Sequence, residues 1–108
     1  MSDDSTPLEA SFVMVVAGGV ATLCVEGELD LAADDALSSA LDRAMGTACS
    51  ELVVDLHACP FLSGSAFALI EAAASELQVR RARIVVRGQP PSFDLIATAV
   101  GGYVFDAV

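Results

Sequence analysis

Two serines lie on either side of a glycine at the point where an apolar strand is expected to give way to a helix. The stretch Phe61–Phe67 reads Phe-Leu-Ser-Gly-Ser-Ala-Phe and follows the apolar run Leu52–Leu56. At a helix start, unpaired backbone N–H groups and the helix dipole favour a hydrogen-bond acceptor or an added negative charge. Ser63 and Ser65 are therefore candidates for capping or for phosphorylation. Gly64 lies between them and has no side chain that could accept a phosphate.

A second group with chemical potential consists of Asp55 and His57, shortly before these serines. Aspartate, histidine and serine together can build a hydrolytic triad. The nucleophile-elbow pattern Gly-x-Ser-x-Gly is absent, however, and one histidine near a serine is a common coincidence. Asp55 also resembles the phosphoacceptor of a receiver domain, but that chemistry needs a lysine and the chain contains none. We therefore expect no enzymatic activity.

The three cysteines, Cys24, Cys49 and Cys59, are dispersed along the chain. An odd number at scattered positions is typical of reduced thiols in the cytoplasm rather than of a disulfide framework. One histidine and three scattered cysteines also lack the spacing of a metal site. We expect neither a metal nor another cofactor.

The charge balance excludes nucleic acid as a direct partner. The formal net charge is −10 and Lys and Arg together number only five, whereas binding to a phosphate backbone requires many cations. Four arginines cluster as Arg80, Arg81, Arg83 and Arg87. The cluster indicates either a solvated edge and helix end or an anchor for an acidic partner or a phosphate.

Length and apolar content are typical of one globular domain. The chain has 108 residues and is 55% apolar, which is enough to bury one core and too much for a disordered chain. Its longest apolar run, Phe12–Ala17, is far shorter than the roughly 20 residues that span a bilayer, so we expect no membrane insertion. The first ten residues lack the basic side chains of a secretory leader. The expected location is the cytoplasm.

Strands and helices are expected to alternate around these groups. Ser11–Val16 and Ala21–Glu26 predict a hairpin, joined by a Gly-Gly pair suited to the positive φ angles of a tight turn. Leu52–Leu56 lacks alternation, which is typical of a central strand covered on both faces. Beyond the hairpin, the patterns predict helices over 33–45, 63–77 and 92–100, with Ser92 as the N-cap of the last, and strands over 52–56, 82–86 and 103–105.

Strand-helix-strand units of this length enforce parallel pairing with right-handed crossovers. The sequence therefore predicts an α/β fold: a mixed sheet made of an N-terminal β-hairpin and then αβαβαβ, with helices packed on the sheet. Residues 1–8 are expected to form a flexible tail and residues 9–108 a single domain.

The elements and two of their loops resemble the STAS domain of anti-sigma-factor antagonists. Gly27–Asp30 reads Gly-Glu-Leu-Asp, and Asp30 matches the loop aspartate of that family. In the family the second helix opens with Asp-Ser-(Ser/Thr)-Gly, and the first serine takes a phosphate from a partner kinase. Without gaps, Ser63 lies at the aspartate position, Gly64 at the phosphoacceptor, Ser65 at the second hydroxyl and Ala66 at the glycine.

The resemblance implies a protein that binds an anti-sigma factor of the ATP-dependent serine kinase type and so releases a sigma factor. The implied partner-binding residues are Asp30, Ser63, Gly64, Ser65, Ala66 and Phe67. Because Gly64 replaces the acceptor, we expect no phosphorylation at the usual position, which leaves Ser65 and Ser63 as alternative acceptors. The alternative function is a cytoplasmic STAS subunit of a lipid-transporting ABC complex, in which the same helix start touches the ATPase. A homodimer is a further alternative.

Overall fold

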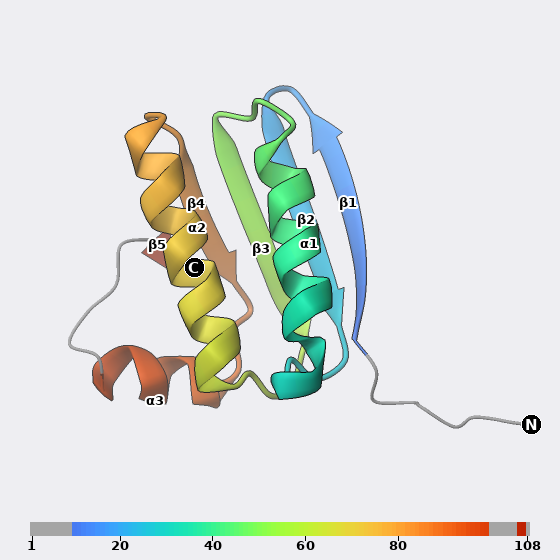
Figure 1. Cartoon of the computed structure of the whole chain (residues 1–108), viewed down its shortest axis with the longest axis vertical. Helices are drawn as coiled ribbons and strands as arrows, with labels where there is room; N and C mark the ends of the chain where they lie inside the picture. Colours follow the sequence, from blue (N-terminus) through green and yellow to red (C-terminus); the bar gives the residue numbers. More distant parts are fainter. Residues whose placement is uncertain (1–9, 100–105, 108) are drawn as a thin grey trace, which may run out of the picture.

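Five strands form one sheet in the order β1-β2-β3-β4-β5 (Figure 1). The fold is that of a computed structural model, which describes residues 10–99 and 106–107. The predicted tail, residues 1–8, and the predicted strand 103–105 lie outside the described residues. In chain order the elements are β1 (Ser11–Ala17), β2 (Val20–Glu26), the 3-10 turn η1 (Leu31–Ala33), α1 (Asp34–Met45), β3 (Glu51–Ala58), α2 (Gly64–Val79), β4 (Arg83–Arg87), α3 (Pro91–Ala99) and β5 (Asp106–Ala107).

The predicted hairpin and the predicted parallel strands are both confirmed. β1 and β2 pair antiparallel in unbroken register from one end to the other, and Gly18 and Gly19 make the turn with φ angles of +59° and +80°. All further pairs, β2 with β3, β3 with β4 and β4 with β5, are parallel. The crossover helices impose this direction, as expected for strand-helix-strand units.

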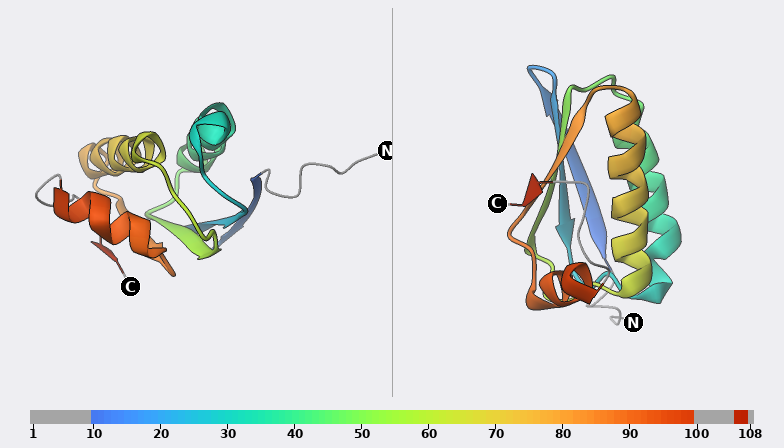
Figure 2. Two further views of the ribbon diagram at one scale, coloured as in Figure 1. Left: turned by 90° about the horizontal axis from the view of Figure 1, so that it is seen from below. Right: turned by 90° about the vertical axis from the view of Figure 1, so that its left-hand side faces the viewer.

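Both long helices, α1 and α2, lie on the same face of the sheet, and α3 lies across its end (Figure 2). The predicted alternation of β2 is confirmed, because Leu23 is fully buried beneath the helices while its neighbour Cys24 points to the other face and is exposed. We call that other face the open face, since no described helix covers it. None of the described helices is long and apolar enough to cross a membrane.

β3 differs from its prediction in length and in coverage. It runs two residues further, to Ala58. Val53 is only 6% exposed although it lies on the open face, which no described helix covers. His57 on the same face is exposed, however, so the expected coverage fails at this end of the strand.

The helix starts also differ from their predictions. α1 begins at Asp34, one residue late, because η1 precedes it. Ser92 is not the N-cap of α3, which begins one residue earlier at Pro91. Proline suits the first helical position, where its missing N–H leaves no hydrogen bond unmade. The hydroxyl of Ser92 instead accepts a hydrogen bond from the backbone N–H of Leu62, 3.1 Å away.

Candidate functional site

Two loops that are distant in the sequence lie side by side at the carboxyl ends of β2 and β3. The N–H of Leu29 donates to the carbonyl of Phe61 at 3.0 Å, and the N–H of Ser63 donates to the carbonyl of Leu29 at 2.9 Å. Leu29 and Leu62 thus form an isolated parallel bridge beyond the strands. This bridge brings the Gly27–Asp30 loop against the start of α2.

Ser63 caps α2, which confirms the capping prediction. Its backbone is extended, and its Oγ accepts a hydrogen bond from the N–H of Ala66 at 3.2 Å. Gly64 follows as the first helical residue and is exposed. A Cβ at Gly64 would have no atom within 4 Å, so the fold does not require a glycine there. A serine at this position would fit without displacing any neighbour.

Ser65 links the starts of α2 and α1. Its hydroxyl donates to the Oδ1 of Asp34 at 3.1 Å, and its Oγ lies 3.0 Å from that of Ser63. Ser63, Ser65 and Asp34 therefore form a short polar chain that holds the two helix ends together. Sequence reasoning missed Asp34, whose position in the first turn of a helix predicts only an interaction with the helix dipole.

Two of the predicted contact residues are buried. Ala66 is fully buried, and Phe67 is 2% exposed. The ring of Phe67 packs on that of Phe93 in α3, with centroids 5.0 Å apart and planes tilted by 57°. Ala66 and Phe67 therefore support the helix start from below, whereas the other members of the predicted set are exposed or partly exposed.

Asp30 is exposed and its carboxylate makes no hydrogen bond or ion pair with any described residue. Its backbone carbonyl accepts a hydrogen bond from the N–H of Ala33, so Asp30 caps η1 through its backbone and not through its side chain. Two apolar side chains beside it are also exposed, Leu31 at 74% and Phe61 at 43%. This loop thus presents a carboxylate that has no partner among the described residues, together with solvent-exposed apolar groups, an arrangement suited to contact with another protein.

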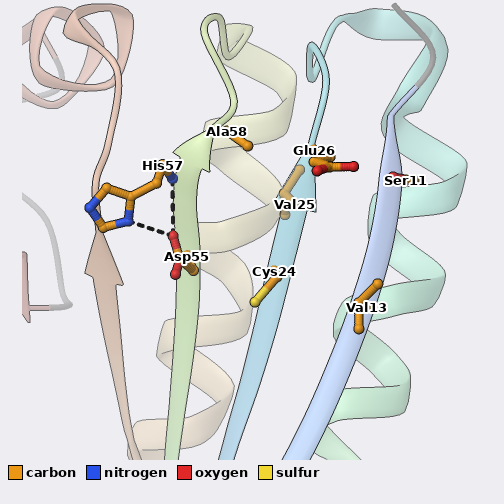
Figure 3. A pocket seen from close by; sticks show the side chains of 8 residues that line it. All are labelled: Ser11, Val13, Cys24, Val25, Glu26, Asp55, His57 and Ala58. Atoms are coloured by element: carbon orange, nitrogen blue, oxygen red, sulfur yellow. Dashed lines mark hydrogen bonds and ion pairs between the residues drawn. The ribbon is translucent and has the colours of Figure 1, made fainter. Parts of the chain in front are cut away.

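The Asp55–His57 pair lies on the open face of the sheet (Figure 3). The Oδ1 of Asp55 accepts the N–H of His57 at 3.0 Å and lies 2.7 Å from its Nδ1, and Arg87 donates to Oδ2 at 3.2 Å. The hydroxyls of Ser63 and Ser65 are bonded on the helix side of the molecule. The structure therefore does not bring together a serine-histidine-aspartate triad.

Most of the arginine cluster is used within the chain. Arg87 pairs with Asp55, and Arg83 lies 3.5 Å from a carboxylate oxygen of Glu51. Arg80 bonds both Glu76 and the carbonyl of Met45, at 2.8 Å each, which ties α2 to the end of α1. These pairs favour the interpretation as a solvated edge over that as an anchor for an acidic partner.

All three cysteines are free, with Cys24 exposed and Cys49 and Cys59 buried. Burial raises the pKa of the Cys59 thiol. Its Sγ–H donates to the carbonyl of Phe61 at 3.1 Å. Cys59 is therefore held as a neutral thiol beneath the loop that leads to α2, where it supports that loop.

Asp55 should make the stability of the protein depend on pH at the acidic end. The pKa of Asp55 lies below its ordinary value of 3.8, chiefly because the backbone N–H of His57 donates to it, with further help from the His57 and Arg87 side chains against the effect of burial. A lowered pKa in the folded state contributes stability above the unfolded pKa, and this contribution is lost as pH falls through the folded value. We expect Asp55→Asn to lower the free energy of unfolding by about 1 kcal/mol at neutral pH.

Urea denaturation of both proteins, from neutral pH to below the ordinary aspartate pKa, measures this contribution. The gap between wild type and Asp55→Asn should shrink as the pH falls. Asp42→Asn is the matched control, since Asp42 is exposed on α1 and its carboxylate makes no such contact with the residues that the structure describes. A gap that stays constant with pH would show that the carboxylate charge of Asp55 does not stabilise the fold.

The family model described as "Mlab, STAS domain" matches residues 14–101. No curated protein matches the chain by sequence.

Among solved structures, an anti-sigma factor antagonist from Mycobacterium paratuberculosis is similar at a TM-score of 0.76 and 23% identity, over 88% of this chain and 80% of that one. The anti-sigma factor antagonist SpoIIAA in its unphosphorylated form is similar at 0.74 and 17%, over 91% and 88%. A variant of RsbS from Moorella thermoacetica is similar at 0.71 and 15%, over 90% and 85%. These likenesses show that the fold is shared.

Proposed function

Since the chain belongs to the STAS domain family, we propose that it is an anti-sigma-factor antagonist, which binds an anti-sigma factor of the ATP-dependent serine kinase type and so releases a sigma factor. Solved structures of the same fold include anti-sigma factor antagonists, which supports this role. The observation that carries the proposal is the exposed start of α2, to which the bridge between Leu29 and Leu62 brings the loop of the exposed Asp30. We propose that the protein acts in the cytoplasm.

The partner contacts Asp30, Ser63, Gly64 and Ser65, and binding is not switched off by phosphorylation at the usual position. Gly64 has no hydroxyl to modify. Both alternative acceptors are already engaged, because Ser63 caps the helix and Ser65 donates to Asp34. A phosphate on Ser65 would add about −1.5 to −2 charges next to the Asp34 carboxylate, which like-charge repulsion opposes.

Affinity purification of the tagged protein from its native cells, followed by mass spectrometry of the bait and its partners, tests the role. The proposal expects a histidine-kinase-like ATPase as partner and a bait that carries no phosphate. An ABC ATPase recovered with its permease would instead support the alternative, a cytoplasmic STAS subunit of a lipid-transporting complex. The absence of the phosphoacceptor is equally compatible with this transporter role.

Restoring the acceptor tests the assignment of Gly64. In the variant Ser63→Asp with Gly64→Ser, the new aspartate can still cap α2, and the new serine has open space around it. The purified partner kinase with ATP should then transfer one phosphate to the variant, which intact-protein mass spectrometry detects. Ser63→Asp alone is the matched control and should remain unmodified. If the double variant binds a competent kinase and still gains no phosphate, the assignment of Gly64 to the acceptor position is wrong.

A further inference from the structure

β1 is a free edge of the sheet. Its only partner among the described strands is β2, and it lies at the edge of the sheet (Figure 1). The backbone N–H and C=O groups along its outer side therefore have no partner strand among the described residues. Such a row of unpaired groups is a ready template for another strand, and proteins usually protect it with charges, proline, a bulge or a covering element.

β1 itself has no charged residue, no proline and no bulge that would protect this edge. The run Ala10–Val25, which contains all of β1 and β2 except the terminal Glu26, has no charged residue and no proline. The register of β1 with β2 has no shift, so no bulge twists the edge away. Val13 and Val15 are 60% and 56% exposed, and Val13 lies beside Cys24 on the open face (Figure 3).

We propose that this edge is the interface with a second copy of the chain, in which two β1 strands pair antiparallel about a two-fold axis through Met14. In a chain with net charge −10, β1 carries no charged residue, and the hairpin carries only Glu26, at the end of β2 opposite Ser11. The hairpin is therefore the surface on which two copies approach with the least electrostatic repulsion.

The pattern of β1 is also complementary to itself. Val13 and Val15 are spaced equally about Met14 and share one face of the sheet, since strand side chains alternate. Two-fold antiparallel pairing places Val13 of each copy opposite Val15 of the other, so four valines meet in one apolar row across a continuous sheet. This interface uses no residue of the proposed partner-binding site, so it stands independently of the proposed function.

Sedimentation velocity over a range of protein concentrations tests the dimer. The wild type should show a concentration-dependent dimer, strengthened by added salt because salt screens repulsion between two acidic chains. Val15→Lys should weaken the dimer by at least about tenfold, since it buries a lysine opposite a valine. Val79→Lys makes the same change at an apolar side chain of α2 that is 85% exposed, and should dimerise like the wild type.

Complementary charges test the register. Val13→Lys and Val15→Glu should each be monomeric alone and form a heterodimer when mixed, because the stated pairing places the introduced lysine opposite the introduced glutamate. Circular dichroism of each variant checks that it is folded. A monomeric wild type at all concentrations would overturn the proposal, as would equal weakening by Val15→Lys and Val79→Lys. Folded variants that form no heterodimer would overturn the stated register.

Discussion

Phe67→Ala should lower the free energy of unfolding by about 3–5 kcal/mol. Phe67 is 2% exposed and packs on Phe93, so the change removes a large apolar side chain and leaves a cavity between α2 and α3. A domain of this size is stable by only about 5–15 kcal/mol, so a substantial part of its stability depends on this ring. Equilibrium denaturation in urea, followed by circular dichroism, measures the loss.

Phe61→Ala is the matched control for this change. It removes the same atoms from a ring that is 43% exposed and lies only a few residues earlier, so its cost should stay below that of Phe67→Ala by about 2 kcal/mol or more. Equal losses in the two variants would contradict the described packing of α2 on α3. Because Phe67 lies directly beneath the proposed contact residues, its variant should also bind the partner more weakly through disorder of the helix start.

Gly88→Ala should lower the free energy of unfolding by about 2–3 kcal/mol, for two separate reasons. Gly88 has a φ of +69°, in the left-handed region that an alanine adopts only with strain. A Cβ there would also lie closer to the ring of His57 than van der Waals contact permits. The ring would have to move, and its hydrogen bond to Asp55 would be lost. Urea denaturation measures the combined cost.

A double-mutant cycle separates the two causes. His57→Ala removes the ring, so adding Gly88→Ala to that background should cost only the backbone strain, about 1–2 kcal/mol. Gly64→Ala is the control for glycine replacement without contact or strain, and should change stability by no more than about 1 kcal/mol, in the stabilising direction. If Gly88→Ala costs the same with and without His57, the ring does not contact this glycine.

The sheet and long helices could be predicted because their hydrophobic periods are clean. The alternation around Leu23 in β2 and the helical stripe from Phe67 to Leu77 in α2 both mark the sides that the structure buries. The same stripe places Phe67 on the side of α2 that the structure buries. Pro91 likewise indicates that the helix begins before Ser92, because proline favours the first helical position.

The contacts between helices could not be predicted in this way. The hydrogen bond from Ser65 to Asp34 depends on how closely the starts of α1 and α2 approach, which no local pattern encodes. The bond from Leu62 to Ser92 depends in the same way on the position of α3 across the end of the sheet. The sequence could therefore locate Ser63 and Gly64 at a helix start, but not the partners of the neighbouring side chains.

Because of the bridge between Leu29 and Leu62, binding of a ligand to this surface is coupled to folding of the whole domain. The bridge joins the loop after β2 to the loop after β3, so the surface exists only while both strands are in place. By mass action, a partner that binds only the folded chain adds about 2.7 kcal/mol to its stability at a free concentration one hundred times the dissociation constant. Binding should therefore slow amide hydrogen exchange even at the centre of the sheet, wherever exchange proceeds through global unfolding. In the cell, occupancy by the partner would then set the lifetime of the protein against proteolysis, so that its abundance follows that of its partner.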